Sequence, residues 1–285
     1  MELNILCFLP IIIISLNSQK SLNAIKYFIS QRVASLIFII IFFIKNIIFY
    51  SEILIILSIL FKLGIPPFHS WVIRIINYLN YNEIFIILIL QKFIPMLILR
   101  KIKIKFEIII IIIIFNYIFL LIFVNIIRYI RLILFFSSRT NSLWILSVIN
   151  IKEIWFKFIL IYGFMNIILF FILNKLNLYK LSIFNKFIFI DVIILIIIFF
   201  NLAGFPPFLG FFIKLMIIKL ILFLNFFIII ILIFLSLIII YMYILIIYYY
   251  ISFIEYKNFI YINLRKTTIF IRINFILFIL LINLF

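Results

Sequence analysis

The stretch EIIIIIIIFNYIFLLIFVNII, residues 107–127, carries one charged side chain, Glu107, at its first position. An apolar run of about 18 residues or more is typical of a helix that spans a lipid bilayer. Apolar runs recur along the whole chain, separated only by short polar gaps. The ten ranges lie near 2–16, 28–44, 53–76, 84–99, 107–127, 130–149, 154–173, 187–213, 217–252 and 269–285. We therefore expect about ten membrane-spanning helices.

The composition of the chain also indicates a bilayer environment. Of the 285 residues, 70% are hydrophobic, and the mean hydropathy is +1.53. Soluble domains average about 45–50% apolar residues, and a soluble fold of this length could not hide the excess. Strands of membrane barrels alternate polar and apolar residues, whereas these runs are apolar on all sides. The sequence therefore predicts an all-α protein, a polytopic bundle of transmembrane helices.

The charges and the few reactive residues exclude several classes of function. The net charge is +18, but Lys and Arg lie mainly in the gaps, as in KIKIK (101–105) and RKTTIFIR (265–272). There they would meet lipid headgroups, so nucleic acid is not an expected partner. Cys7 and His69 are the only cysteine and histidine, which excludes an intrachain disulfide, a cysteine metal site and a bis-histidine haem. The chain also has no glycine-rich phosphate loop, so we expect it to hold no cofactor.

The choice of residues indicates where the protein is made. Ile, Phe, Leu, Asn, Lys and Tyr dominate the chain, and their codons are mostly rich in A and T. Such a bias is usual in some organelle genomes. The N-terminus shows no cleavable signal or transit peptide, which fits synthesis inside the organelle.

Two segments share an unusual pattern, KLGIPPFHSW at 62–71 and LAGFPPFLGFFIK at 202–214. Each contains Gly-x-Pro-Pro-Phe, in a chain that has only 6 prolines and 4 glycines. Two consecutive prolines remove two backbone donors and clash with the preceding turn, and the glycine relaxes the backbone. We therefore expect a spanning helix to be interrupted in both segments. The expected break positions are Gly64, Pro66, Pro67, Gly204, Pro206 and Pro207.

Interrupted helices in corresponding places of two halves indicate a transport site between inverted repeats. The alternative is a pair of kinked helices that only pack well. On the first interpretation, residues 1–285 form a single transmembrane domain. The first repeat would cover about 1–106, the second about 107–252, and a C-terminal helix about 269–285.

Four ionisable residues are expected at membrane depth. Lys62 and Lys92 each lie near the middle of a predicted span, and Lys214 follows the second break. Glu2 begins the first span, which is shorter than the hydrocarbon core of a bilayer, so Glu2 would lie inside the membrane or the bilayer would be thinner there. A charge at the bilayer centre costs ~2.5–3.5 kcal/mol even on the lenient insertion scales, so we expect these side chains to face the bundle interior and relay protons. For Lys214, snorkelling to an interface is the alternative. His69 is a further candidate, with a structural hydrogen bond as its alternative role.

Five further acidic residues are expected near the ends of spans rather than inside them. Their default role is a solvated helix end or an ion pair with a nearby Lys or Arg. These residues are Glu52, Glu83, Glu107, Glu153 and Asp191.

Six segments give the chain a resemblance to a known family. The chain resembles mitochondrial NADH dehydrogenase subunit 2, a family of antiporter-like subunits in the membrane arm of respiratory complex I. The similarity runs nearly from end to end, and the lysine-containing motifs around the two breaks are specific in combination. The segments are MELNILCFLPI (1–11), AIKYFISQRVAS (24–35), KLGIPPFHSWV (62–72), QKFIP (91–95), LILFFSSRTNSLW (132–144) and GFPPFLGFFIK (204–214).

The resemblance implies a role and a set of site residues. In that family a membrane-embedded Glu and three Lys form the proton path, and by motif they correspond to Glu2, Lys62, Lys92 and Lys214. The whole complex passes electrons from NADH to ubiquinone and moves protons outward. FMN, iron–sulfur clusters and ubiquinone would lie in or at other subunits, so this chain would hold no redox centre. The implied setting is multi-pass in the mitochondrial inner membrane, among other membrane-arm subunits and lipids.

The chain also departs from the family pattern. The first helix of the family and the start of the second have no counterpart here, so either the true start lies upstream or the subunit is shortened. Ile73 and Arg74 replace a proline and an acidic residue, Leu132 stands where a lysine is usual, and Leu245 replaces an arginine. Two other functions therefore stay open. The chain could be a free-standing cation/proton antiporter subunit, or a structural subunit whose proton path has decayed.

Overall fold

The computed structural model describes residues 8–10, 12, 18–44, 51–102, 104–124, 129–176, 189–222 and 226–254. Every secondary-structure element in these ranges is a helix, which confirms the predicted all-α class. The predicted spans at 2–16 and 269–285 lie mostly or wholly outside the described residues. The count of about ten helices and the inverted repeats therefore stay predictions.

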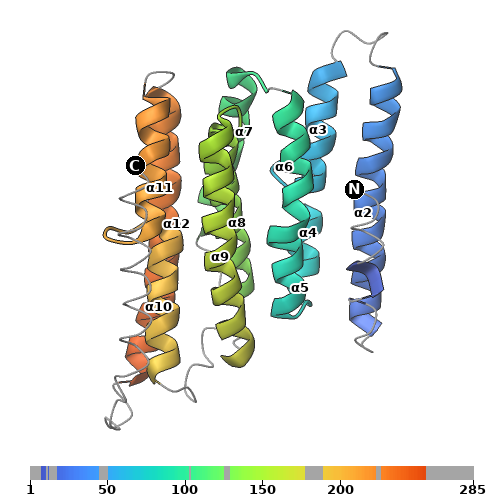
Figure 1. The fold of residues 1–285 in the computed structure, drawn as a ribbon. Coiled ribbons are helices and arrows are strands. Elements are labelled where there is room, and N and C mark those ends of the chain that lie inside the picture. Colours follow the sequence, from blue (N-terminus) through green and yellow to red (C-terminus); the bar gives the residue numbers. More distant parts are fainter. Residues whose placement is uncertain are drawn as a thin grey trace. The chain divides into compact units, whose positions relative to one another are not determined.

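The described residues fall into two compact units, whose helices are labelled in Figure 1. Unit 1 covers Met1–Asn125 with Ile149–Lys152, and unit 2 covers Ile126–Val148 with Glu153–Phe285. The helices of unit 1 are α2 (Ser18–Phe43), α3 (Ser51–Leu63), α4 (Ser70–Ile76), α5 (Tyr81–Phe85), the π-helix η1 (Ile86–Leu90), α6 (Gln91–Ile102) and α7 (Phe106–Phe123). Those of unit 2 are α8 (Ile130–Ser147), α9 (Lys152–Leu176), α10 (Phe189–Ala203), α11 (Leu209–Ile221) and α12 (Phe226–Ile254).

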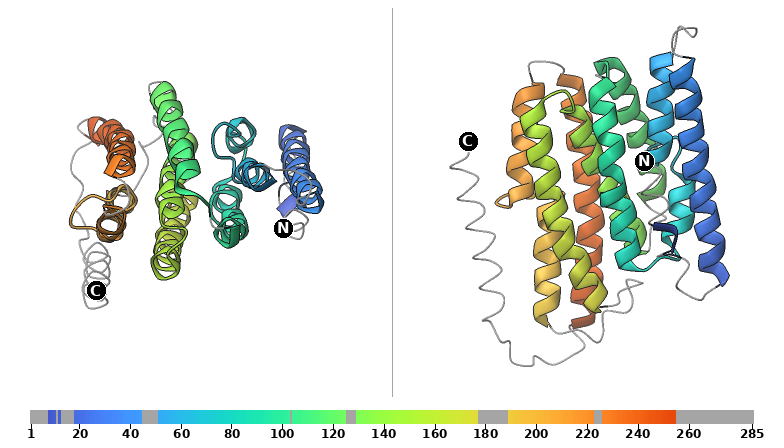
Figure 2. Two further views of the ribbon diagram at one scale, coloured as in Figure 1. Left: turned by 90° about the horizontal axis from the view of Figure 1, so that it is seen from above. Right: turned by 45° about the vertical axis from the view of Figure 1, so that its right-hand side comes forward.

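Within each unit the helices lie alongside one another, and most are seen nearly end-on from above (Figure 2). In unit 1, α2 packs against α3 and α4, and α3 packs against α6. In unit 2, α12 contacts α8, α10 and α11, and α8 contacts α11. Each interrupted helix pair is therefore held by neighbours from its own unit.

Five helices in the described part of the chain are long and apolar enough to cross a membrane. Helix α7 shows how such a helix divides its surface. Its single amide, Asn116, lies on the buried side and donates to the carbonyl of Ile112 at 2.8 Å. The opposite face exposes apolar side chains. They suit contact with lipid tails, because the bilayer core holds no water and a polar group there would lack a hydrogen-bond partner. These side chains are Ile111, Phe115, Ile118 and Ile122.

The first predicted break lies between α3 and α4. Gly64 has φ +65°, and its N–H donates to the Phe61 carbonyl at 3.1 Å. The N–H of Ile65 donates to the Leu60 carbonyl, also at 3.1 Å. These two bonds form a Schellman motif, in which a residue with positive φ ends a helix. The carbonyls of the last two helical residues, Lys62 and Leu63, take no part in it.

The second break, between α10 and α11, repeats this backbone geometry. Gly204 has φ +80°, and its N–H donates to the Asn201 carbonyl at 3.2 Å. The N–H of Phe205 donates to the Phe200 carbonyl at 3.0 Å. Again a Schellman motif ends the helix, and two consecutive prolines prevent it from continuing. Both predicted interruptions are therefore confirmed.

Three predicted spans differ from the helices in the structure, two in a boundary and one in an internal turn. Helix α2 begins at Ser18, not near residue 28, because its first turns carry polar residues that an apolar-run reading leaves out. The predicted span 217–252 is wrong at its start, since α11 continues to Ile221 and α12 begins at Phe226. The predicted span 84–99 contains a π-helix, η1, upstream of Pro95. A proline in a helix cannot donate to the carbonyl four residues back, and wider turns nearby accommodate it.

Candidate functional site

Lys214 occupies the end of the interrupted helix α10. Its Nζ donates to the Ala203 carbonyl at 2.6 Å and lies 3.4 Å from the Leu202 carbonyl. These are the two carbonyls that the Schellman motif of this break leaves open. The side chain is only 8% exposed, and Nζ lies 5.8 Å from the centre of the Trp144 ring. Since the C-terminal end of a helix carries partial negative charge, the ammonium caps α10 both by hydrogen bonds and by charge.

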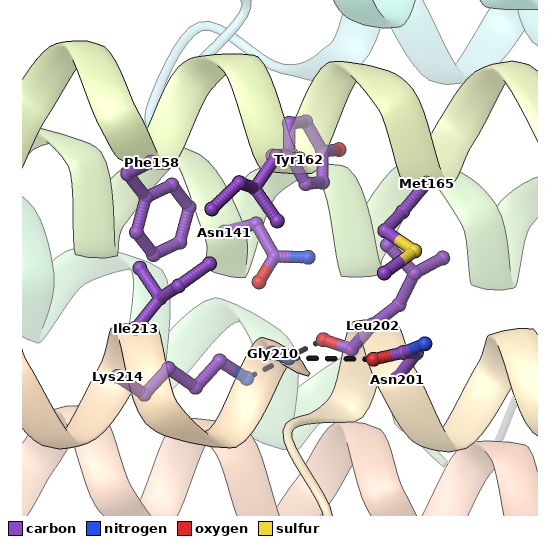
Figure 3. A pocket seen from close by; sticks show the side chains of 10 residues that line it. Asn141, Phe158, Tyr162, Met165, Asn201, Leu202, Gly210, Ile213 and Lys214 are labelled. Atoms are coloured by element: carbon purple, nitrogen blue, oxygen red, sulfur yellow. Dashed lines mark hydrogen bonds between the residues drawn. The ribbon is translucent and has the colours of Figure 1, made fainter. Parts of the chain in front are cut away.

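A small cavity lies beside this lysine (Figure 3). Its polar lining consists of Asn141 from α8, Tyr162 from α9, Asn201 from α10 and Lys214 itself. Figure 3 shows Asn141 and Lys214 approaching the same space from two different helices. The centre of a water molecule has about 20 Å³ to move in, and a water requires roughly 10–15 Å³. The cavity is therefore large enough for a water molecule, which can carry a proton, next to the lysine amine.

Gly210 allows α11 to approach α10 at this site. Its N–H donates to Oδ1 of Asn201 at 3.3 Å. A Cβ atom built on Gly210 would overlap the backbone carbonyl of Asn201. The close approach brings Lys214, one turn further along α11, within reach of the end of α10. A residue with a side chain would separate the two helices.

The first break uses different capping groups. Lys62 lies in the last turn of α3 and is half-buried. Its backbone carbonyl, which the break leaves open, accepts a hydrogen bond from Nε2 of Gln31 on α2 at 3.2 Å. The indole Nε1 of Trp71 donates to the Phe61 carbonyl, also at 3.2 Å. Neutral side chains therefore cap this helix end.

Lys92 lies on α6, in the same unit as Lys62 and on a helix that packs against α3. It is half-buried and follows the π-helix η1 by two residues. A π-turn adds one residue to the helix and so rotates everything after it relative to a regular α-helix, and such turns recur at functional sites. The structure thus places Lys62 and Lys92 on contacting helices of unit 1. Lys214 belongs to unit 2, so it forms a site of its own.

The remaining predicted site residues have different outcomes. Glu2 lies outside the described residues. His69 precedes α4 and packs on two rings of α7, with ring centroids 3.5 Å from Phe119 and 6.4 Å from Phe123. These ring contacts test neither the structural hydrogen bond nor the part in proton transfer, so both roles stay predictions.

Sequence reasoning placed Glu83 at a solvated helix end or in an ion pair. The structure shows it 4% exposed, so the solvated role is wrong. Its Oε2 accepts the backbone N–H of Asn80 at 2.8 Å, as part of a capping box at the start of α5. The signal was present, because an Asn followed three residues later by Glu is typical of a helix N-terminus.

Other buried polar residues were missed as well. Arg139 is 3% exposed, and its Cζ lies 4.5 Å from the centre of the Phe135 ring. The polar run SSRTNS (137–142) inside an apolar segment could have revealed it. Gln31 and Tyr27, spaced four residues apart on α2, could likewise have been recognised as one buried polar face. Among the described residues, no three His, Cys, Asp or Glu side chains gather at one place.

No protein-family model matches the chain. A solved chain has a similar fold, with a TM-score of 0.70 at 15% identity. It belongs to respiratory complex I from Thermus thermophilus with bound aureothin, and the match covers 80% of this chain and 59% of that one. The likeness supports the arrangement of helices described above.

Two sequence relatives of this chain carry the same protein name. The NADH-ubiquinone oxidoreductase chain 2 of Rhipicephalus sanguineus is 35% identical over 296 residues, covering 100% of this chain and 92% of the relative. The protein of the same name from Artemia franciscana is 31% identical over 231 residues, covering 77% of this chain and 71% of the relative. The first of these matches covers the whole of this chain and so includes both interrupted helices. The chain belongs to the family of NADH-ubiquinone oxidoreductase chain 2.

Proposed function

We propose that this chain is a membrane-embedded, proton-translocating subunit of NADH-ubiquinone oxidoreductase, respiratory complex I, in the mitochondrial inner membrane. Its partners are the other subunits of the membrane arm and the surrounding lipids. Electron transfer from NADH to ubiquinone takes place at cofactors of other subunits. The chain contributes a path for protons.

The observation that carries this proposal is the buried ammonium of Lys214 at the end of α10. A lysine taken out of water at membrane depth is expensive unless it is paired, and such residues mark ion or proton pathways. The two carbonyls of α10 hold the protonated form in place. The cavity with Asn141 and Asn201 gives the amine a polar neighbourhood when it releases its proton.

The proton path is proposed to run through the three lysines, Lys62, Lys92 and Lys214, with Glu2 acting on Lys62. Each lysine would take up a proton on its amine and pass it to the next group in the path. Charge would then move over a long distance without a large movement of the protein chain. The breaks at Gly64–Pro67 and Gly204–Pro207 supply backbone carbonyls and space for water where a continuous helix would supply neither.

Replacing Lys92 by Met tests the relay, since methionine fills a similar volume without a titratable group. We expect the complex to assemble, and proton uptake per NADH oxidised in reconstituted vesicles to fall about tenfold, as for ~1.4 kcal/mol added to a transfer barrier. Lys101→Met, at an exposed lysine on the same helix, is the matched control. Unchanged pumping in Lys92→Met would rule out the relay.

One observation favours the second candidate, a structural subunit without a proton path. A cap on a broken helix is needed whether or not protons move, and Lys214 provides one. In that case Lys214→Met would lower stability while pumping per assembled complex stays at the parent value. A free-standing cation/proton antiporter is distinguished by purification, because only a complex I subunit copurifies with flavin and iron–sulfur subunits.

A further inference from the structure

One face of α2 carries polar side chains into the interior of unit 1. Asn23, Tyr27 and Gln31 recur every four residues, and their side chains are 3%, 1% and 4% exposed. Residues at this spacing lie on one side of a helix. The lysine relay proposed above makes no use of them, although a buried amide or hydroxyl is costly unless it finds a partner.

Gln31 finds its partner at the first break. Its Nε2 donates to the carbonyl of Lys62, one of the two carbonyls that the Schellman motif leaves open. At the second break the equivalent carbonyls are taken by the ammonium of Lys214. The same backbone geometry is thus capped once by a neutral amide and once by a charged lysine.

Tyr27, one turn earlier on α2, reaches the helix that carries the second lysine of this unit. Its side chain lies near that of Gln91, the residue before Lys92. The Tyr27 ring also lies 6.2 Å from the ring of Trp71, which donates to the same helix end that Gln31 caps. The polar face of α2 therefore binds the end of the helix that carries Lys62 and lies beside the start of the helix that carries Lys92.

We propose that Gln31 is a positioning residue for Lys62. Its amide caps the carbonyl opened by the break and so competes with the ammonium of Lys62 for that acceptor. A lysine near a helix C-terminus readily binds the last carbonyls, and the negative end of the helix favours its protonated form. Without Gln31, Lys62 would take the place that Lys214 has at the second break and would hold its proton more tightly. This inference rests on the proposed function, since it matters only if Lys62 transfers protons.

Gln31→Met tests the inference, because methionine has nearly the same length and no donor. In complex I reconstituted in vesicles, we expect assembly to be retained and proton uptake per NADH to fall roughly threefold, the scale of one lost hydrogen bond. The pH at which pumping is half-maximal should also move to more alkaline values, because a better-held proton leaves only at higher pH. The matched control is Ser35→Ala. Ser35 is likewise buried on α2, and its hydroxyl donates to the carbonyl of Arg32 in its own helix, at 2.9 Å.

Gln31→Glu gives an independent variant of the same shape. A protonated carboxylic acid can donate to the Lys62 carbonyl, whereas an ionised carboxylate cannot. Pumping in this variant should approach the parent value as the pH falls and drop below it as the pH rises. It also carries the test if Gln31→Met fails to assemble.

Two results would overturn the inference. One is that both Gln31 variants pump as Ser35→Ala does. The other is a loss of pumping by the same factor at every pH, which a purely structural tie would produce. Normal pumping in Lys92→Met would instead overturn the proton path itself. A defective Lys92→Met together with parent-like Gln31 variants overturns only the role of Gln31.

Discussion

The two interrupted helices share a backbone and differ in what caps it. Gly64 and Gly204 both adopt positive φ, and the same pair of backbone hydrogen bonds closes each helix. One open carbonyl, that of Lys62, is then bound by Gln31 from a neighbouring helix at the first break, whereas Lys214 from the following half-helix binds both open carbonyls at the second. The local motif therefore fixes where a helix ends, and the packing around it decides whether a titratable group sits there.

The difference also separates two roles for a lysine. At the second break the lysine is part of the fold, because its ammonium holds α10 and α11 together. At the first break the neutral side chains of Gln31 and Trp71 donate to the helix end, and Lys62 supplies a backbone carbonyl to that cap. Variants that change one break and leave the other intact can test this distinction.

The largest effect is expected from Gly210→Ala. The new methyl group would overlap the backbone carbonyl of Asn201, which no side-chain rotation can relieve. We expect a loss of about 3 kcal/mol or more, at the upper end for overpacked sites, and little assembled complex in mild detergent. The control is Gly163→Ala on α9, where a Cβ meets nothing within 4 Å. That change should be neutral or add up to ~1 kcal/mol. Equal yields of the two variants would contradict a close contact between α10 and α11.

An intermediate effect is expected from Lys214→Met. The change leaves the buried Ala203 carbonyl without its donor, which costs about 1–3 kcal/mol. We expect both a lower temperature of heat inactivation and a loss of proton uptake per NADH. Lys219→Met, at an exposed position on the same helix, should change stability by less than ~0.5 kcal/mol. A variant that stays as heat-stable as the Lys219→Met control would show that the lysine does not cap α10.

The smallest effect, and the sharpest comparison, comes from the two positive-φ glycines. Gly64→Ala and Gly204→Ala should each lose about 1–2 kcal/mol, because a left-handed backbone disfavours a side chain. Only at Gly204 would the new Cβ press on the lysine, at 2.8 Å from Cδ of Lys214, whereas at Gly64 it meets the side chain of Val72. We therefore expect Gly64→Ala to be at least as sensitive to heat as Gly204→Ala, because its Cβ would overlap the buried Val72 side chain, but reduced pumping per assembled complex only in Gly204→Ala. Equal pumping defects would remove the proposed difference between the breaks.

Much of the architecture could be predicted from the sequence. Gly-x-Pro-Pro-Phe ends a helix by itself, since proline lacks the N–H and glycine accepts positive φ, so both breaks were predicted correctly. Apolar runs identified most helices, but not the first turns of α2 or the boundary between α11 and α12. In α2 the polar residues Asn23 and Tyr27 are buried, so they do not mark a gap between helices. Between α11 and α12 the single polar residue, Asn225, is too weak a signal to mark a helix boundary.

The candidate site was predicted only in part. Depth along a helix singled out Lys62, Lys92 and Lys214, because charge is costly anywhere in the bilayer regardless of partners. The partners themselves could not be read from spacing. Nothing in the segment around Gln31 shows that its amide would reach a carbonyl 31 positions away in the sequence.

The sequence by itself determined the membrane environment, the all-α class, the two helix breaks and the three lysines. These follow from the hydrophobic content of the chain and from the backbone chemistry of glycine and proline, which act locally. Only the tertiary structure decided that Lys214 caps α10, that Gln31 caps α3, and that Asn141, Tyr162 and Asn201 line the cavity beside Lys214. These contacts join residues far apart in the chain, and their geometry depends on how closely neighbouring helices approach, as Gly210 allows at the second break.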